Sequence, residues 1–211
     1  MRDEGINNLV FSITCAVYGE PESLPMTEAH AQQPINPYGT TKMIVEGMLQ
    51  DFYAAHGLNS IALRYFNPIG AHESAKIGEL PIGVPQNLIP FVTQTAAGIR
   101  KELSVFGSDY PTPDGTAVRD YIHVVDLAKA HIVALSRLLN NKNKASFEVF
   151  NIGTGQGNSV LEVINSFEKV TGKKLNYKLV ERREGDITAA YADTTIANNE
   201  LGWKAELSLD D

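Results

Sequence analysis

The sequence predicts an α/β protein built on part of a parallel sheet. Two apolar runs of strand-forming residues, Asn8 to Thr14 (NLVFSIT) and Ser60 to Asn67 (SIALRYFN), flank a helical segment from Thr40 to His56. Strands that are apolar on both faces are typical of buried parallel sheets. A strand, a helix and a strand in this order predict one parallel crossover unit.

The other elements follow in order along the chain. The segment Glu20 to Pro37 carries four prolines and predicts a long loop. In the helix that follows, Gly57 marks the end, and five apolar side chains share one face. These are Ile44, Val45, Met48, Leu49 and Phe52. Beyond this helix we expect a loop from Asn67 to Pro85, a helix from Asn87 to Ile99, a strand from Leu103 to Gly107 and a turn from Pro111 to Gly115. A helix capped by Asp126 and running to about Leu139 follows, and then a strand from Phe147 to Ile152. The last elements are a helix from Val160 to Val170, with Ser159 and Glu162 as its capping box, and a strand from Leu175 to Glu181.

The composition excludes several classes of protein. The net charge of -7 argues against a nucleic-acid partner, because no basic excess is present to neutralise phosphates. The single cysteine, Cys15, excludes an intrachain disulfide and a Cys-rich zinc site and favours a reducing cytoplasm. The opening residues (MRDEG) are not typical of a signal peptide, and no run has the length of a membrane-spanning helix. We therefore expect a cytoplasmic protein without a metal or a membrane partner.

The sharpest chemical signal is the pair Tyr38 and Lys42 at the start of the predicted helix. Residues four apart lie on the same face, one helical turn from each other. An ammonium group near a phenol favours the phenolate, which can act as a general base. The spacing is common, so taken alone it favours an exposed tyrosine and a solvated lysine. Thr14 ends the first strand, where ligands bind in open α/β sheets, and its hydroxyl can relay a proton. Taken alone, Thr14 is better explained as an ordinary β-branched strand residue.

Successive blocks of the chain, taken together, resemble one enzyme family. The blocks are FSITCAVYG (11–19), PYGTTK (37–42), RYFNPIGAH (64–72), NLIP (87–90), VFG (105–107), DGTAVRDYIH (114–123), NIGTGQGNSV (151–160), RREGD (182–186) and ELGW (200–203). Their order is similar to that in the UDP-glucose 4-epimerases of the extended short-chain dehydrogenase/reductase family. The resemblance covers essentially the whole chain and is more specific than any single block.

The resemblance implies a fold and a reaction. Residues 1–70 would form the C-terminal part of an NAD(P)-binding Rossmann-like domain. Residues 71–211 would form mostly a smaller α/β domain that binds the UDP-sugar, with some segments returning to the first domain. The reaction would interconvert UDP-galactose and UDP-glucose through a 4-keto sugar, with transient hydride transfer to NAD. The intact family is expected to form homodimers.

The resemblance also implies the catalytic and cofactor-binding residues. The family's serine–tyrosine–lysine triad maps onto Thr14, Tyr38 and Lys42, with threonine in place of the usual serine. Tyr38 and Lys42 would also contact the cofactor, Lys42 at the nicotinamide ribose. Tyr65 and Phe66 would lie near the nicotinamide.

The implied substrate-binding residues lie further along the chain. They are Asn67, Asn87, Leu88, Ser104, Val105, Phe106, Arg119, Arg183 and Asp186. The strand 104–106 would contact the uracil, the two arginines would hold the diphosphate, and Asp186 would accept from a ribose hydroxyl. Without the resemblance, surface salt bridges with Asp120 or Glu184 would explain the arginines better.

Other positions qualify this interpretation. Ile13 and Thr14 carry methyl groups that would crowd the nicotinamide or the sugar. Ala190 is small where the family can hold a larger residue, which would be compatible with UDP-N-acetylhexosamines. Gly153 to Gly157 (GTGQG) follows a strand and precedes a helix, but its spacing departs from the dinucleotide fingerprint, so we interpret it as a structural turn.

No glycine-rich cofactor loop precedes Asn8, so the resemblance implies that the N-terminal part of the enzyme and a short helical C-terminus lie outside these residues. Three functions stay open. The first is a UDP-hexose 4-epimerase, present as a fragment inactive alone. The second is another NAD-dependent nucleotide-sugar enzyme: a dehydratase, decarboxylase or reductase. Dehydratases usually add acidic residues beside the hydroxyl residue, and Cys15 and Ala16 offer none. The third is a non-catalytic remnant that binds a sugar nucleotide or a partner.

Overall fold

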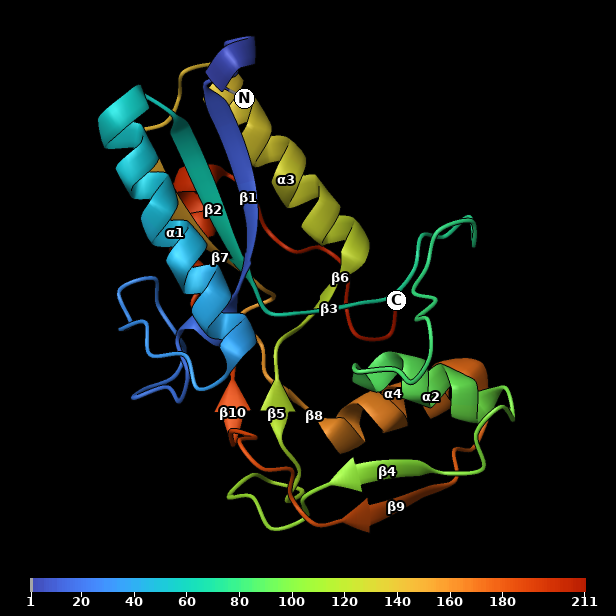
Figure 1. Cartoon of the computed structure of the whole chain (residues 1–211). Coiled ribbons are helices and arrows are strands. Elements are labelled where there is room, and N and C mark those ends of the chain that lie inside the picture. The colour runs from blue at the N-terminus through green and yellow to red at the C-terminus, as the bar shows by residue number, and fades with distance from the viewer. Residues whose placement is uncertain (1) are drawn as a thin grey trace.

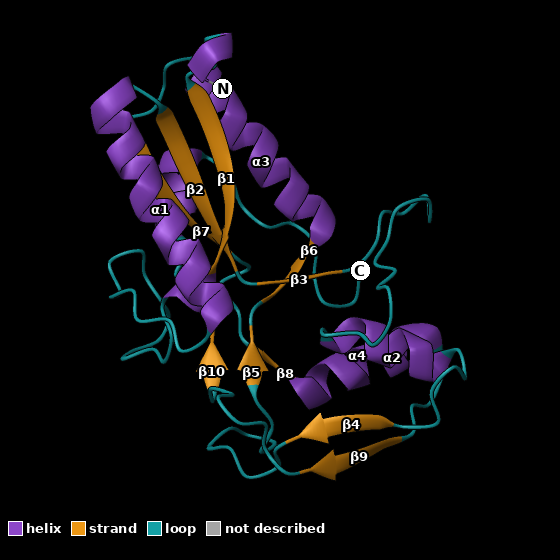
Figure 2. Cartoon of the chain, in the orientation of Figure 1, coloured by secondary structure: helices purple, strands orange, loops and turns teal. Residues whose placement is uncertain are grey.

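The structure is a computed structural model that describes residues 2–211. Its helices and strands form two lobes (Figure 1, Figure 2). The first lobe is a parallel sheet in the order β1 (Asn8–Thr14), β2 (Asn59–Tyr65), β7 (Phe147–Ile152). α1 (Pro37–His56) covers one face and α3 (Val124–Leu139) the other. The predicted α/β class and crossover unit are confirmed.

The second lobe packs two helices on a short parallel pair of strands. β4 (Leu103–Phe106) pairs with β9 (Tyr177–Val180), and α2 (Leu88–Ala96) and α4 (Val160–Thr171) lie over them (Figure 1). One apolar core joins these elements, and its buried members are Val92, Leu103, Val105, Ile164 and Leu175. The predicted capping box of α4 is confirmed, because Ser159 Oγ accepts from the N–H of Glu162 and the Glu162 carboxylate accepts from the N–H of Ser159.

Short strands connect the two lobes. β3 (Asn67–Ile69) pairs with β6 (Tyr121–His123), while β10 (Ala189–Ala190), β5 (Val118–Arg119) and β8 (Asn158–Ser159) form a small mixed sheet. The sequence predicted none of them, because strands of two or three residues are too short for a period-two pattern. Short single-turn helices at Arg2–Glu4, Cys15–Val17 and Ala197–Leu201 complete the fold.

The alternation of side chains along β2 separates two cores. Ile61 and Leu63 pack in a cluster with apolar residues of α3 and with Trp203 near the C-terminus. Ala62 packs on the opposite face in a cluster that contains Ile13. A strand that is apolar on both faces therefore lies between two helical layers, as the continuous apolar run predicted.

α1 differs from its prediction in where its apolar side chains lie. Leu49 is buried, but Ile44, Met48 and Phe52 are 53%, 51% and 46% exposed. The sheet-facing side of the helix instead holds Glu46, a carboxylate that the apolar pattern could not place there.

Glu46 is buried because it pairs with a buried arginine. Arg64 on β2 donates to both carboxylate oxygens of Glu46, and its Nη1 donates to Tyr18 Oη over 2.9 Å. Tyr18 in turn donates to Asn151 Oδ1 over 2.6 Å. Burial would lower the pKa of Arg64, but the hydrogen bonds that Arg64 donates to Glu46 outweigh burial and raise this pKa above its usual value, so the guanidinium stays charged. This buried network anchors α1 to the sheet.

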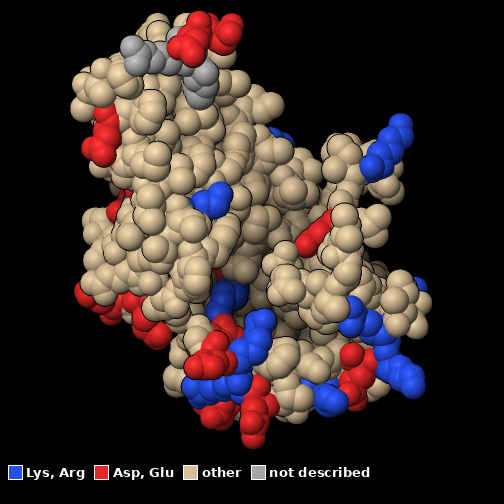
Figure 3. All heavy atoms as spheres, viewed as in Figure 1, with Lys and Arg blue, Asp and Glu red and all other residues tan. Residues whose placement is uncertain are grey.

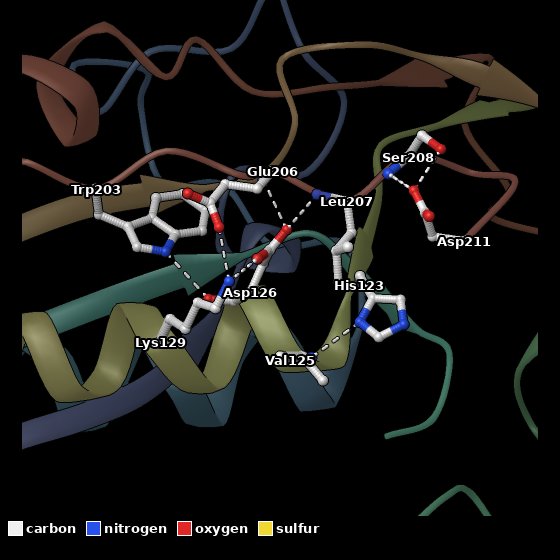
Figure 4. Close-up of polar contacts among 9 residues, drawn as sticks. All are labelled: His123, Val125, Asp126, Lys129, Trp203, Glu206, Leu207, Ser208 and Asp211. Carbon is white, nitrogen blue, oxygen red and sulfur yellow. Dashed lines mark hydrogen bonds and ion pairs between the residues drawn. The ribbon is translucent and has the colours of Figure 1, made fainter. Parts of the chain in front are cut away.

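The prediction that Asp126 caps α3 is wrong. The helix begins at Val124, and the cap is His123, whose Nδ1 accepts from the N–H of Val125 over 3.1 Å. Asp126 is fully buried and turns toward the C-terminal segment (Figure 4). Its Oδ2 accepts from the N–H groups of Glu206 and Leu207, each over 2.8 Å. The carboxylate therefore ties the C-terminal segment to α3.

None of the helices within residues 2–211 combines the length and the apolar character needed to cross a membrane.

Candidate active site and nucleotide cavity

Tyr38 lies in the first turn of α1, next to the end of β1. The helix begins at Pro37, and the side chain of Asn36 caps it by accepting from the N–H of Gly39 over 2.8 Å. A Cβ atom at Gly39 would lie 2.5 Å from the carbonyl oxygen of Ala16, so only glycine allows this close approach. The helix start therefore packs directly on the turn that follows β1. Tyr38 remains 52% exposed.

Lys42 extends from α1 to the backbone of β1. Its Nζ donates to the carbonyl oxygen of Ser12 over 3.0 Å and lies 5.1 Å from the centroid of the Phe11 ring. The same Nζ lies 5.9 Å from the centroid of the Tyr38 ring, so the two side chains share a helical face, as their spacing predicted.

Thr14 and Tyr38 line one cavity of about 480 Å³, which we call the tyrosine cavity. Tyr65 and Phe66, predicted near the cofactor, line it as well, and so does Ala190. Thr14 is buried, and its Oγ1 accepts from the N–H of Ala16 over 3.1 Å.

Ile13 lies differently from Thr14. Its side chain is fully buried in the core with Val17 and Met26. The methyl groups of Ile13 therefore fill the core and do not line the tyrosine cavity. Of the two residues, only Thr14 is placed where its methyl group would crowd the nicotinamide or the sugar.

A second cavity, of about 160 Å³, lies between α2, β4 and β5, and we call it the arginine cavity. Every substrate-binding residue implied by the sequence lines it: Asn67, Asn87, Leu88, Ser104, Val105, Phe106, Arg119, Arg183 and Asp186. These residues come from segments far apart in the sequence, and the fold brings them together. Their role in binding stays a prediction.

Two arginines and one aspartate dominate the charge of the arginine cavity. Arg119 forms an ion pair with Asp186 and also donates to the carbonyl oxygen of Ile187 over 2.9 Å. Arg183 lies 3.6 Å from Asp186 and stacks on Phe106, with 4.9 Å between its guanidinium carbon and the ring centroid. Asp186 is thus the partner of both arginines, in place of the expected Asp120 or Glu184.

The two cavities share a wall. Asn67, Pro68, Asn87, Arg119 and Asp186 line both of them. Figure 3 shows a hollow between the two lobes, with Lys and Arg side chains gathered at its lower end. A single elongated ligand can therefore place one part beside the arginines and another beside the tyrosine.

Burial controls the ionisation of several groups around the shared wall. It raises the pKa of the Tyr121 phenol to about 12 and that of the Cys15 thiol to about 12. Cys15 is therefore a neutral thiol at physiological pH and no candidate nucleophile. Burial and the nearby Tyr38 raise the pKa of Tyr65. Arg119 and Asp186 are the charged residues of the shared wall.

Sequence reasoning missed part of the lining of the arginine cavity. The missed residues are Pro68, Ile69, Gln86, Ile89, Phe91, Leu103, Ala117, Tyr121 and Val160. Tyr121 was within reach of the pattern, because it lies two residues after Arg119 and extended chain places such residues on the same side. The others, apart from the polar Gln86, are apolar, and no pattern marks them as binding residues.

Comparison with known proteins decides the family. The protein-family model described as GDP-mannose 4,6 dehydratase matches residues 1–211. The chain belongs to that family. Among curated relatives, the UDP-glucose 4-epimerase of Mus musculus is 53% identical over all of this chain and that of Bacillus subtilis is 50% identical. The chain spans about 60% of the length of the mouse relative and 62% of the Bacillus relative.

Solved structures of the family agree with these relatives. A UDP-glucose-4-epimerase from Stenotrophomonas maltophila, with bound NAD and formylated UDP-arabinopyranose, has a TM-score of 0.95 and 50% identity. The UDP-glucose 4-epimerase from Bifidobacterium longum, in complex with NAD+ and UDP, has a TM-score of 0.92 and 49% identity. Each comparison covers the whole of this chain and 62% of the other. The resemblance inferred from the ordered blocks is confirmed.

Proposed function

We propose that this chain supplies the catalytic tyrosine and the UDP-sugar site of an NAD-dependent UDP-hexose 4-epimerase. The wall shared by the two cavities carries the proposal, because it lets one nucleotide sugar extend from the arginines to Tyr38. The relatives, which are UDP-glucose 4-epimerases at 50–53% identity, point to the same substrate class.

The nucleotide occupies the arginine cavity. Phe106 offers a ring for the uracil, and Asp186 offers a carboxylate for a ribose hydroxyl. Arg119 and Arg183 exchange their shared partner Asp186 for the diphosphate oxygens, to which a guanidinium can donate in pairs.

The sugar occupies the tyrosine cavity. There Tyr38 accepts the proton of the sugar 4-hydroxyl, and Thr14 orients that hydroxyl by hydrogen bonding. The Lys42 ammonium lies near the Tyr38 ring, where it stabilises the negative charge that develops on the tyrosine oxygen during proton transfer. Tyr38 then returns this proton to the 4-oxygen, while the inversion at C4 itself would come from the hydride that the cofactor would accept and give back to the opposite face of the sugar.

The residues present fit the nicotinamide end of the cofactor. The Lys42 ammonium uses one of its three protons on Ser12 O, which leaves donors for ribose hydroxyls at the carboxyl end of β1. Tyr38, Tyr65 and Phe66 line the adjoining cavity. NAD supplies a reversible hydride acceptor there when it is bound.

Two alternatives are less well supported. A dehydratase removes water with the help of acids and bases, yet Thr14 is followed by Cys15 and Ala16, and Asp186 is the one carboxylate in the lining of the tyrosine cavity. Asp186 already pairs with Arg119. A purely sugar-nucleotide-binding role accounts for the arginine cavity but leaves Tyr38 and Lys42 without a task.

Other properties belong to the same proposal. Ala190 leaves room in the tyrosine cavity for an N-acetyl group, so UDP-N-acetylhexosamines are additional substrates. The half-exposed apolar side chains Ile44, Met48 and Phe52 on α1 support a homodimer of the intact protein. The free thiol Cys15 is in keeping with a cytoplasmic location.

Titration of the purified chain with UDP, followed by an assay of UDP-galactose conversion with added NAD, tests the function. UDP binding together with conversion supports the epimerase. Binding without conversion limits the chain to a sugar-nucleotide-binding role. A chain that binds no UDP contradicts the whole proposal.

A further inference from the structure

The buried carboxylate of Asp120 accepts four hydrogen bonds from two segments of the chain. Oδ1 accepts from the N–H and the hydroxyl of Thr154, over 2.8 and 2.7 Å. Oδ2 accepts from the N–H groups of Gly155 and Ala192, each over 3.1 Å. The side chain is fully buried. All four partners are donors, so the site is built for an acceptor-only group.

The GTGQG segment is shaped around this carboxylate. A Cβ atom at Gly153 would lie 2.4 Å from Asp120 Oδ2, and Gly155 has a φ of +76°. Both glycines are therefore required: one for close approach and one for a left-handed backbone. The turn that resembles a phosphate-binding loop in the sequence binds an anion of its own chain.

The backbone of the same residue joins the strands that carry the shared wall. The N–H of Asp120 donates to the carbonyl oxygen of Ala190 over 3.0 Å, and its carbonyl oxygen accepts from the N–H of Asn67 over 2.9 Å. Asn67 lines both cavities and Ala190 lines the tyrosine cavity. The neighbours of Asp120 in the chain, Arg119 and Tyr121, line the arginine cavity.

We infer that Asp120 is a positioning residue for the nucleotide: its carboxylate, bound in the 153–155 turn, holds Arg119, Tyr121 and Asn67 in register around the cavity wall. Asp120 does not line either cavity, so it acts through these residues. The inference rests on the proposed UDP site and adds to it the residue that fixes its geometry.

Asp120→Asn is the direct test, because it preserves shape but turns an NH₂ group toward N–H donors. Asp126→Asn is the matched control. Asp126 is also fully buried, and its carboxylate accepts two backbone hydrogen bonds against three for Asp120, but those two tie the C-terminal segment to α3 (Figure 4). Thr154→Val is a milder variant that removes one of the four hydrogen bonds and leaves the carboxylate in place.

UDP affinity is measured by calorimetry for the three variants and the unchanged chain, at a temperature where circular dichroism shows each to be folded. We expect Asp120→Asn to weaken UDP binding about tenfold or more, Thr154→Val to weaken it several-fold, and Asp126→Asn to stay within about twofold despite its lower melting temperature. If Asp120→Asn does not fold, the comparison of Thr154→Val with Asp126→Asn decides.

Three outcomes would overturn the inference. An unchanged UDP affinity in Asp120→Asn shows that the carboxylate does not position the residues of the cavity wall. If only Thr154→Val folds, an unchanged UDP affinity in that variant shows the same. An equal loss in Asp126→Asn shows a general effect of stability. If the chain binds no UDP before any substitution, both the proposed function and the inference are contradicted. The first two outcomes contradict only the inference.

Discussion

Arg119 and Asp186 form an ion pair in the wall that the tyrosine cavity shares with the arginine cavity. The arginine comes from β5 and the aspartate from the loop before β10, so the pair joins two strands that lie side by side. The ion pair holds the guanidinium of Arg119 in a fixed position, with its charge partly neutralised, where a diphosphate is expected.

Replacing Arg119 tests this wall. Arg119→Ala removes a charged donor, and such hydrogen bonds contribute about 1.5–3 kcal/mol, so UDP affinity should fall by roughly 10- to 150-fold. Calorimetric titration with UDP gives the dissociation constant. Arg182→Ala is the control, since Arg182 pairs with Asp109 at the surface and does not line the cavity, and its affinity should change by less than about twofold. Equal losses in both variants would contradict the assignment.

Tyr38→Phe separates proton transfer from binding. The change removes one hydroxyl from a side chain that lines the tyrosine cavity, while the arginine cavity is unaffected. We expect UDP-galactose conversion to fall by about 10²- to 10⁴-fold, the usual contribution of a general base, with UDP affinity unchanged. A coupled assay of UDP-glucose formation and a UDP titration give the two values. Retained conversion would exclude Tyr38 as the base.

Ala190→Tyr tests the room for an N-acetyl group. Ala190 is buried and lines the tyrosine cavity, so a tyrosine ring there fills space that the sugar substituent would use. UDP-GlcNAc should then bind at least tenfold more weakly than before, while UDP-glucose changes little. Competition of both nucleotides against labelled UDP measures the ratio. The same ratio in the two proteins would remove Ala190 as a determinant of substrate size.

Much of the fold could be predicted from the sequence, because the long elements carry strong local signals. The apolar runs at 8–14 and 147–152 have the same bounds as β1 and β7, and Ser159 with Glu162 located the start of α4. The predicted cap of α3 was wrong, because His123 is an unusual cap and the carboxylate of Asp126 accepts hydrogen bonds from the distant segment 206–207. A local pattern carries no information about such a partner.

The candidate site depended on a different kind of information. Tyr38 and Lys42 were visible as a helical pair, but the arginine cavity draws on segments from Asn67 to Asp186 that no spacing connects. The ordered blocks of the family supplied those residues. The role of the GTGQG turn stayed hidden, because its partner Asp120 lies 34 residues from Thr154.

The exposed stripe of α1 gives a prediction about assembly. Ile44, Met48 and Phe52 lie four residues apart on one side of the helix and are each about half exposed. Met48→Lys places a charge in the middle of the stripe and should shift a homodimer to a monomer at micromolar concentration. Light scattering after gel filtration measures the mass. Gln50→Lys, at an exposed position on the other side of the helix from the stripe, is the control and should leave the mass unchanged.

Arg137 and Glu148 predict a loss of stability in acid. Their side chains are 10% and 9% exposed, and two nitrogens of Arg137 donate to the carboxylate over 2.7 and 2.8 Å. Burial would raise the pKa of Glu148, but the hydrogen bonds from Arg137 and from the N–H of Lys144 outweigh it and hold the pKa below its usual value.

A carboxyl with a depressed pKa stabilises the fold above the pKa of the unfolded chain, about 4.3, and the stabilisation is lost as the pH falls through the lower pKa of the folded state. The free energy of unfolding of the unchanged chain should therefore be about 1–2 kcal/mol larger than that of Glu148→Gln at neutral pH. This difference should shrink below about pH 4. Urea unfolding of both proteins across this range measures the difference, and a gap that stays constant into acid would show that the ion pair contributes nothing.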